Sequence, residues 1–291
     1  MAWMALLLVM ASAPVHAGWN LLAKRQRSEG AFFFGLLKWI TIIGLGPVVL
    51  SEVFRPGMPA KAWVCVLISG CCCGIYFFFL AKSYASSDFT VVYPIARALP
   101  VLLVGLGDVF RGHNPSAMGW VGMSLVALGC VLTPLTSFKD IRWKKYVNWA
   151  SVWMVLTALA TVGYSLSDKT AAEVLIRGPI SAAKYGYFFF LIAFLFYGGL
   201  WHWLGKEKEE SQNIKQSEAA LGAVLNYGCY WMVLWAYQMV GQASYIVAFR
   251  QFSIVLGVLA AFVIYRERGL ATRITAAVMI TGGLVIIGLW G

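Results

Sequence analysis

The chain has 291 residues, of which 60% are hydrophobic and only 12% are charged, and its mean hydropathy is +0.75. Soluble domains carry about 25% charged residues, so this composition excludes a water-soluble globular protein and indicates a chain surrounded by lipid. A net charge of +11 would suit a nucleic-acid partner, but the basic residues are scattered through short loops between apolar runs, which argues against one.

Ten apolar runs are each long enough to cross a bilayer as an α-helix, which takes about 20 residues. Residues 2–17 share some features of a cleavable signal peptide, but no basic residue precedes them and the run continues to Ala23. We therefore interpret residues 2–23 as an uncleaved first membrane helix. The other predicted helices are 31–53, 62–81, 90–110, 117–136, 150–167, 182–204, 219–240, 245–265 and 271–290.

Two of these helices carry features that bear on packing and shape. The small residues of Gly70–Gly74, which read GCCCG, predict close packing of the third helix against a neighbour. Pro94 and Pro100 remove backbone donors from the fourth helix, which predicts a broken or kinked helix there. The six cysteines lie inside apolar runs without paired CxxC spacing and are interpreted as packing residues, not as disulfides or metal ligands.

Weak internal similarity recurs at an offset of 145 to 154 residues. The aligned positions are Gly18-Trp19-Asn20 with Gly163-Tyr164-Ser165, Gly74-Ile75-Tyr76 with Gly228-Cys229-Tyr230, Arg97 with Arg250, and Gly129 with Gly282. Each copy holds five predicted helices, an odd number, so the second copy must cross the membrane upside down relative to the first. The sequence thus predicts two inverted five-helix repeats, residues 1–145 and 146–291.

Alternate loops differ in their content of Lys and Arg. One set has fourteen: Lys24, Arg25, Arg27, Lys82, Lys139, Arg142, Lys144, Lys145, Lys206, Lys208, Lys215, Arg266, Arg268 and Arg273. The other set has six: Arg55, Lys61, Arg111, Lys169, Arg177 and Lys184. The richer side is expected to face the cytoplasm, which places both termini on the outer side.

Two long segments resemble the second half of an EamA domain of the drug/metabolite transporter superfamily. Residues 91–132 read VVYPIARALPVLLVGLGDVFRGHNPSAMGWVGMSLVALGCVL, and residues 244–288 read SYIVAFRQFSIVLGVLAAFVIYRERGLATRITAAVMITGGLVIIG. The resemblance implies an all-α integral membrane fold of ten transmembrane helices, in two inverted five-helix repeats around a central cavity. It also implies transport of a small solute, without indicating which one.

The chain departs from the family pattern in two places. Gly112-His113-Asn114-Pro115 stands where the family often carries a Gly-Glu-Arg turn. The related small multidrug transporters bind protons and cations with a glutamate in their first helix, whereas the first helix here has only His16 and Asn20. This difference argues against a cation/proton antiport mechanism of their kind.

Ionisable residues inside membrane helices are the strongest candidates for function, because each costs at least about 2.5–3.5 kcal/mol to insert. Arg97 and Arg250 are such residues and are repeat equivalents, and the sequence shows no carboxylate near mid-helix to compensate them. We predict that they bind an anionic or zwitterionic metabolite, in a site lined by Arg97, Arg250, Tyr76, Tyr230, His16 and Asn20. The alternative is that each arginine only binds backbone carbonyls or reaches toward an interface.

Asp108, near the outer end of the fourth helix, has two interpretations, a proton site or an interfacial partner of Arg111. No HExxH, GxSxG, P-loop or acidic metal cluster occurs, so neither an enzyme nor a cofactor or metal site is predicted. The predicted function is a multi-pass secondary transporter of the cell membrane, an exporter or exchanger working by alternating access, whose partners are a small-molecule substrate and the lipid bilayer. A non-transporting membrane scaffold or sensor is the first alternative and an intramembrane enzyme the second, and the oligomeric state stays open.

Overall fold

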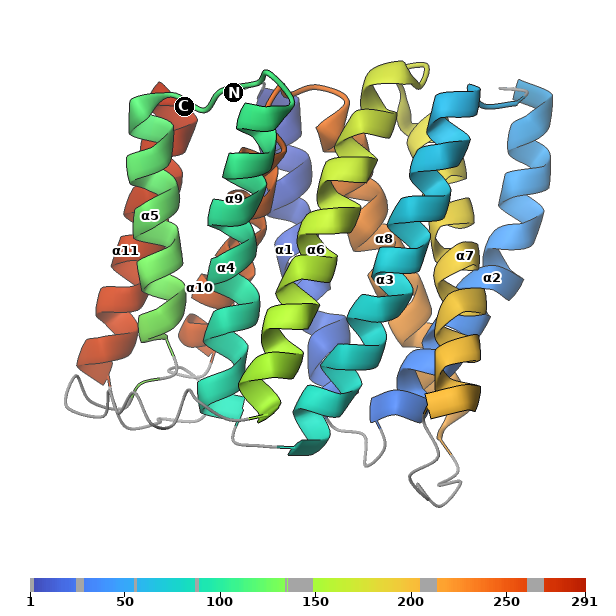
Figure 1. Ribbon diagram of the computed structural model, residues 1–291, viewed down its shortest axis with the longest axis horizontal. Coiled ribbons are helices and arrows are strands. Elements are labelled where there is room, and N and C mark those ends of the chain that lie inside the picture. Colours follow the sequence, from blue (N-terminus) through green and yellow to red (C-terminus); the bar gives the residue numbers. More distant parts are fainter. Residues whose placement is uncertain are drawn as a thin grey trace.

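The computed structural model of the protein describes residues 3–24, 29–54, 57–86, 89–133, 135, 149–204, 214–260 and 270–291. Within these ranges the chain forms eleven α-helices and no β-strand. The helices lie side by side in a bundle, with both termini at the same edge (Figure 1). Their bounds are α1 Trp3–Lys24, α2 Glu29–Phe54, α3 Ala60–Ser86, α4 Phe89–Phe110, α5 Ala117–Leu132, α6 Trp149–Val174, α7 Pro179–Leu204, α8 Gln216–Tyr237, α9 Ala243–Arg250, α10 Phe252–Ala260 and α11 Leu270–Trp290.

The outer surface of this bundle is apolar. Large hydrophobic side chains such as Val49 of α2, Leu67 of α3 and Leu195 of α7 are more than half exposed, which suits contact with lipid. Six of the described helices, α1, α2, α3, α7, α8 and α11, are long and apolar enough to cross a membrane. The protein is an all-helical integral membrane protein, because helices satisfy their own backbone hydrogen bonds in lipid.

Glycines allow the closest helix contacts. A Cβ on Gly70 would lie 2.9 Å from the backbone oxygen of Phe189, so α3 and α7 approach almost backbone to backbone. The close packing predicted for the GCCCG segment is therefore confirmed. In the contact between α5 and α11, a Cβ on Gly129 would meet Ala276, but the glycine of α11 that faces α5 is Gly283 and not the aligned Gly282.

The sixth helix is longer than the apolar run that predicted it. The sequence predicts residues 150–167, whereas α6 extends from Trp149 to Val174 and includes Lys169. Lys169 and Lys184 were both assigned to a loop, which is wrong, because they are buried in α6 and α7. Lys169 is accommodated there by Glu173, one turn away at 3.2 Å, and Lys184 by Glu52 of α2 at 2.7 Å.

The break in a membrane segment falls in the ninth and not in the fourth. α4 is a single helix through Pro94 and Pro100, so the fourth helix is not broken there, while the kink stays a prediction. The predicted helix 245–265 is instead divided at Gln251, which separates α9 from α10. The Gln251 amide donates to the carbonyl oxygen of Ala248, a tightened last turn that ends α9 directly after Arg250.

The helix contacts come in matched sets. α3 packs against α6 and α7, while α8 packs against α1 and α2. α4 packs against α6, and the α9–α10 segment packs against α1, while α5 contacts α11 and α2 contacts α7. In the predicted repeats α1 corresponds to α6, α2 to α7, α3 to α8, α4 to the α9–α10 segment and α5 to α11. When each helix is exchanged for its counterpart, the contact of α3 with α6 becomes that of α8 with α1, and the other contacts are likewise reproduced. The division into inverted repeats at 1–145 and 146–291 stays a prediction that this pattern favours.

Candidate functional site

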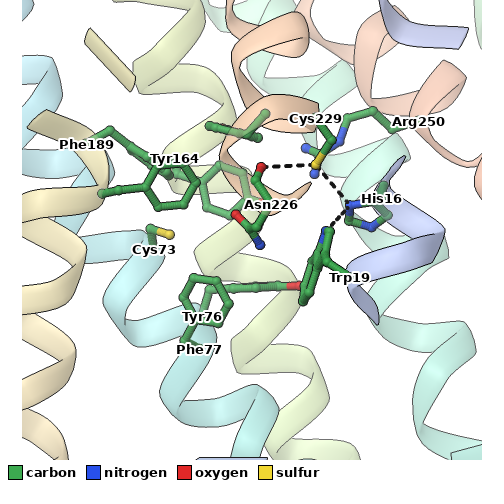
Figure 2. Close-up of a pocket in the computed structure, with 12 residues that line it drawn as sticks. His16, Trp19, Cys73, Tyr76, Phe77, Tyr164, Phe189, Asn226, Cys229 and Arg250 are labelled. Atoms are coloured by element: carbon green, nitrogen blue, oxygen red, sulfur yellow. Dashed lines mark hydrogen bonds between the residues drawn. The ribbon is translucent and has the colours of Figure 1, made fainter. Parts of the chain in front are cut away.

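Two adjoining cavities lie in the middle of the bundle. They enclose about 340 Å³ and about 550 Å³ of empty space, part of it open to solvent, and they share His16, Tyr76, Tyr164 and Arg250. In the first cavity, His16, Cys229 and Arg250 lie on one side and Tyr164 and Phe189 on the opposite side (Figure 2). Helices from both halves of the chain therefore build one central site.

Aromatic rings form much of the wall of the first cavity. Tyr164 of α6 contacts Tyr76 edge-on at 5.8 Å between ring centroids and Tyr230 at 5.9 Å, and Phe189 stacks on Tyr230 at 5.0 Å. Trp19 and Phe77 continue the wall on α1 and α3. The rings hold one another in place, so this wall is a rigid apolar surface with hydroxyl groups at its edges.

Arg250 ends α9 at the junction of the two cavities. Its guanidinium lies over the ring of Tyr230, 5.4 Å from the centroid. Among the described residues, no carboxylate forms an ion pair with it. A cation–π contact stabilises a cation by about 0.5–1 kcal/mol at an exposed site and by about 2 kcal/mol when the cation is desolvated. The face of Tyr230 therefore offsets only part of the cost of burying this charge.

Arg97 of α4 lines the second cavity and contacts α1. Its Nη2 lies 3.0 Å from Nε2 of His16, while Nε1 of Trp19 lies 3.1 Å from Nδ1 of the same ring. Both neighbours are donors, and a neutral imidazole has only one nitrogen that accepts. One of these two contacts to His16 therefore lacks an acceptor.

All six residues predicted for the site line these cavities. Tyr230 lines the first, Asn20 and Arg97 the second, and Tyr76, His16 and Arg250 both. The side-chain amide of Asn20 donates to the carbonyl oxygen of His16, so its remaining oxygen is available to the cavity. Their role in binding a substrate stays a prediction.

Sequence reasoning missed Asp168. This carboxylate is 1% exposed within α6 and accepts hydrogen bonds from the hydroxyls of Ser69, Tyr185 and Tyr230. Because Tyr230 also lies under Arg250, the statement that no carboxylate stands near the arginines is wrong. Asp168 follows directly after residue 167, where the predicted sixth helix ends. It is four residues from Tyr164, and this spacing indicates that the two side chains share a face if the helix continues.

Asp108 is a structural anchor. It is fully buried, pairs with Arg111 at 2.9 Å, and accepts hydrogen bonds from the backbone amides of Ala243 at 3.1 Å and Ser244 at 2.8 Å. These amides open α9, where the helix dipole favours a negative charge. Of the two interpretations of Asp108, the structure shows the pairing with Arg111.

An ion cluster closes the edge of the bundle at which the termini lie. Glu173 of α6 pairs there with Arg111, with Lys169 at 3.2 Å and with His113 at 3.4 Å. Lys169 also donates to the backbone oxygen of Tyr237 at the end of α8, at 3.1 Å. The cluster ties together the ends of α4, α6 and α8 and, through Asp108, the start of α9.

A central cavity enclosed by membrane helices from both halves of the chain is the arrangement in which secondary transporters bind their substrates. Residues 3–134, a little under half of the chain, match the EamA-like transporter family of the drug/metabolite transporter superfamily, the same family that the sequence resembles. Members of this family are transporters and not enzymes. The match ends before residue 146, so the EamA-like character of the second half stays a prediction.

A crystal structure of another protein has the same fold. It aligns over 98% of this chain and 97% of its own length, with a TM-score of 0.71 and 16% sequence identity. At this identity the likeness is one of fold alone. No curated protein matches the chain in sequence.

Proposed function

We propose that the protein is a secondary transporter that carries a small anionic or zwitterionic metabolite by alternating access. One observation carries the proposal, namely that Arg97 and Arg250, from α4 and α9, line the same central cavity. A guanidinium binds a carboxylate or a phosphate through two parallel hydrogen bonds. An anionic group between them could therefore bind both guanidinium groups.

The remaining lining restricts the substrate further. Thr157 and Thr161 of α6 add hydroxyl groups to the second cavity, and Tyr76 and Tyr164 add aromatic faces. Within the described part of the chain, Oε1 of Gln251 accepts no hydrogen bond, although it is buried beside the cavity. A free acceptor next to two cations suits a compact molecule with an ammonium or hydroxyl group close to its acid.

The placement of the cavity supports alternating access. Leu80, Ala96 and Met154 line it within two turns of the end of α3 and the starts of α4 and α6, at the edge opposite the termini (Figure 1). The ion cluster around Glu173 closes the other edge. With the termini predicted outside, this arrangement is an inward-facing one, and the matched helix contacts suit rocking of one half against the other.

The experiment that tests the proposal is thermal unfolding of purified protein in the presence of a library of carboxylates, phosphates, amino acids and cations. A compound that binds only the folded state raises the melting temperature. At a concentration 100 times its dissociation constant, it adds about 2.7 kcal/mol to the free energy of unfolding. We expect stabilisation by compounds with an acid group, lost in Arg97→Ala and Arg250→Ala. Arg177→Ala, in the exposed loop before α7, is the matched control that keeps it.

Stabilisation by cations alone would overturn the assignment of the substrate class. Stabilisation by acids that survives in both arginine variants would place the binding site elsewhere. If no compound stabilises the protein, the result contradicts the transporter proposal and favours the scaffold alternative.

A further inference from the structure

The buried carboxylate of Asp168 has a second property besides its place beside the cavity. All three of its hydrogen-bond partners are hydroxyl groups, from Ser69, Tyr185 and Tyr230. A hydroxyl both donates and accepts. The same three partners therefore satisfy the ionised carboxylate, as three donors, and the protonated acid, when one of them rotates to accept.

The contrast with Asp108 shows what this means. Asp108 accepts hydrogen bonds from Arg111 and from two backbone amides, groups that can only donate. Among the described residues, the donors to Asp168 are hydroxyl groups and not a guanidinium or a backbone amide. Its surroundings thus tolerate both protonation states, as a site that gains and loses a proton requires.

The groups that face Asp168 come from four helices. The titratable ones are Cys65, Cys72 and Cys73 of α3, Tyr185 of α7, Tyr230 and Tyr237 of α8, and Arg250 of α9. Of these described groups, only Arg250 is a cation. The charge of Arg250 therefore adds to the hydrogen bonds that Ser69, Tyr185 and Tyr230 donate in favouring the ionised form of Asp168, and Tyr230 contacts both Asp168 and Arg250.

We propose that Asp168 binds the coupling proton of this transporter, and that Tyr230 and Arg250 link its protonation to occupation of the cavity by an anion. An anion at Arg250 offsets the guanidinium charge, which weakens the electrostatic support for the ionised form of Asp168. Anion binding and protonation of Asp168 therefore promote each other, and this linkage is reciprocal. The inference rests on the proposed function and deepens it.

The sign of the linkage has a consequence for direction. Because the anion and the proton favour the same occupied state, they move across the membrane together. With a proton gradient directed inward, such coupling drives uptake, not the export or exchange expected from the sequence. The device also differs from that of the small multidrug transporters, since the carboxylate lies in the sixth membrane helix and not in the first.

The proton itself is the probe for the test. Full-length protein in lipid nanodiscs is titrated while infrared difference spectra record the C=O stretching band of protonated carboxylic acids. We expect one component of this band to grow as the pH falls, to be absent in Asp168→Asn and to be kept in Asp108→Asn. Asparagine preserves the shape of the side chain, and circular dichroism of each variant checks that it folds.

The linkage is tested by two further variants. Arg250→Gln removes the charge, so the midpoint of the Asp168 band should move to higher pH by about one unit, a tenfold gain in proton affinity. Tyr230→Phe keeps the ring but removes the hydroxyl that bonds Asp168, so it should move the midpoint as well. Arg177→Ala should leave the midpoint in place.

Two results would overturn the inference. One is a set of band components that is the same in Asp168→Asn as in the unaltered protein across the whole pH range in which both stay folded. The other is an unchanged midpoint in Arg250→Gln, which would remove the linkage. Failure of the proposed function looks different, since no acid would then stabilise the protein while the Asp168 band still titrates.

Discussion

At the scale of single residues, the two arginines differ in what holds them. Arg250 lies over an aromatic face, whereas Arg97 shares a histidine with a competing donor. Both arginines line the second cavity. The competing account, in which the arginines only bind backbone carbonyls, assigns them a role in folding alone.

Substitution of Arg97 separates the two accounts. Arg97→Lys keeps the charge but loses the two-pronged geometry, so transport per folded molecule should fall by about tenfold or more, equivalent to at least about 1.4 kcal/mol. Arg97→Ala should abolish transport. The measurement is uptake into proteoliposomes of an acid that stabilises the protein, normalised to folded protein.

The contrary outcome for Arg97 is equally clear. If Arg97→Ala lowers the amount of folded protein while uptake per folded molecule stays normal, the residue is structural. Arg177→Ala provides the baseline for both quantities, because it removes an arginine from an exposed loop.

At the scale of helices, small residues decide which neighbours can meet. A Cβ on Gly70 would lie 2.5 Å from Cβ of Ile192 and 2.9 Å from the backbone oxygen of Phe189. Backbone atoms cannot rotate away as the end of a flexible side chain can. The contact between α3 and α7 consequently depends on the absence of a side chain at this position.

Gly70→Ala should separate α3 from α7 and destabilise the protein by about 1–3 kcal/mol, the usual cost of overpacking. Gly46→Ala in α2 is the matched control, because a Cβ there meets no atom within 4 Å. Thermal unfolding in detergent should show a lower melting temperature for the first variant and an equal or higher one for the second. Equal melting temperatures would show that α7 moves aside at little cost.

At the scale of the whole molecule, both termini lie at the same edge of the bundle (Figure 1). Removing the two buried lysines, Lys169 and Lys184, from the loop count leaves four basic residues on the poorer side against fourteen on the richer one. Most of the fourteen lie outside the described residues. The corrected count strengthens the prediction that the termini face away from the cytoplasm.

A reporter fusion tests this orientation. Alkaline phosphatase fused after Gly291 should be active, because it folds only outside the cytoplasm, and the same enzyme fused after Leu204 should be inactive. The reverse pattern would invert the orientation and turn the cavity toward the outer side, while leaving the helices and the site as described.

The sequence by itself determined what depends on local composition. The lengths of the apolar runs predicted the membrane helices to within a few residues at most ends, and the scarcity of charge inside them singled out Arg97 and Arg250. The cost of an ionised group in lipid does not depend on which helix is its neighbour, so such residues can be recognised before any contact is known.

Only the tertiary structure decided which polar groups are compensated and by what. Asp168 and Lys169 follow an apolar run and resemble the start of a loop, but hydroxyls from α3, α7 and α8 and the carboxylate of Glu173 keep them inside α6. No proline lies near Gln251, so the sequence gives no local indication that the helix ends there. Burial of a polar group depends on partners far away in the sequence, and those partners come together only when the helices pack.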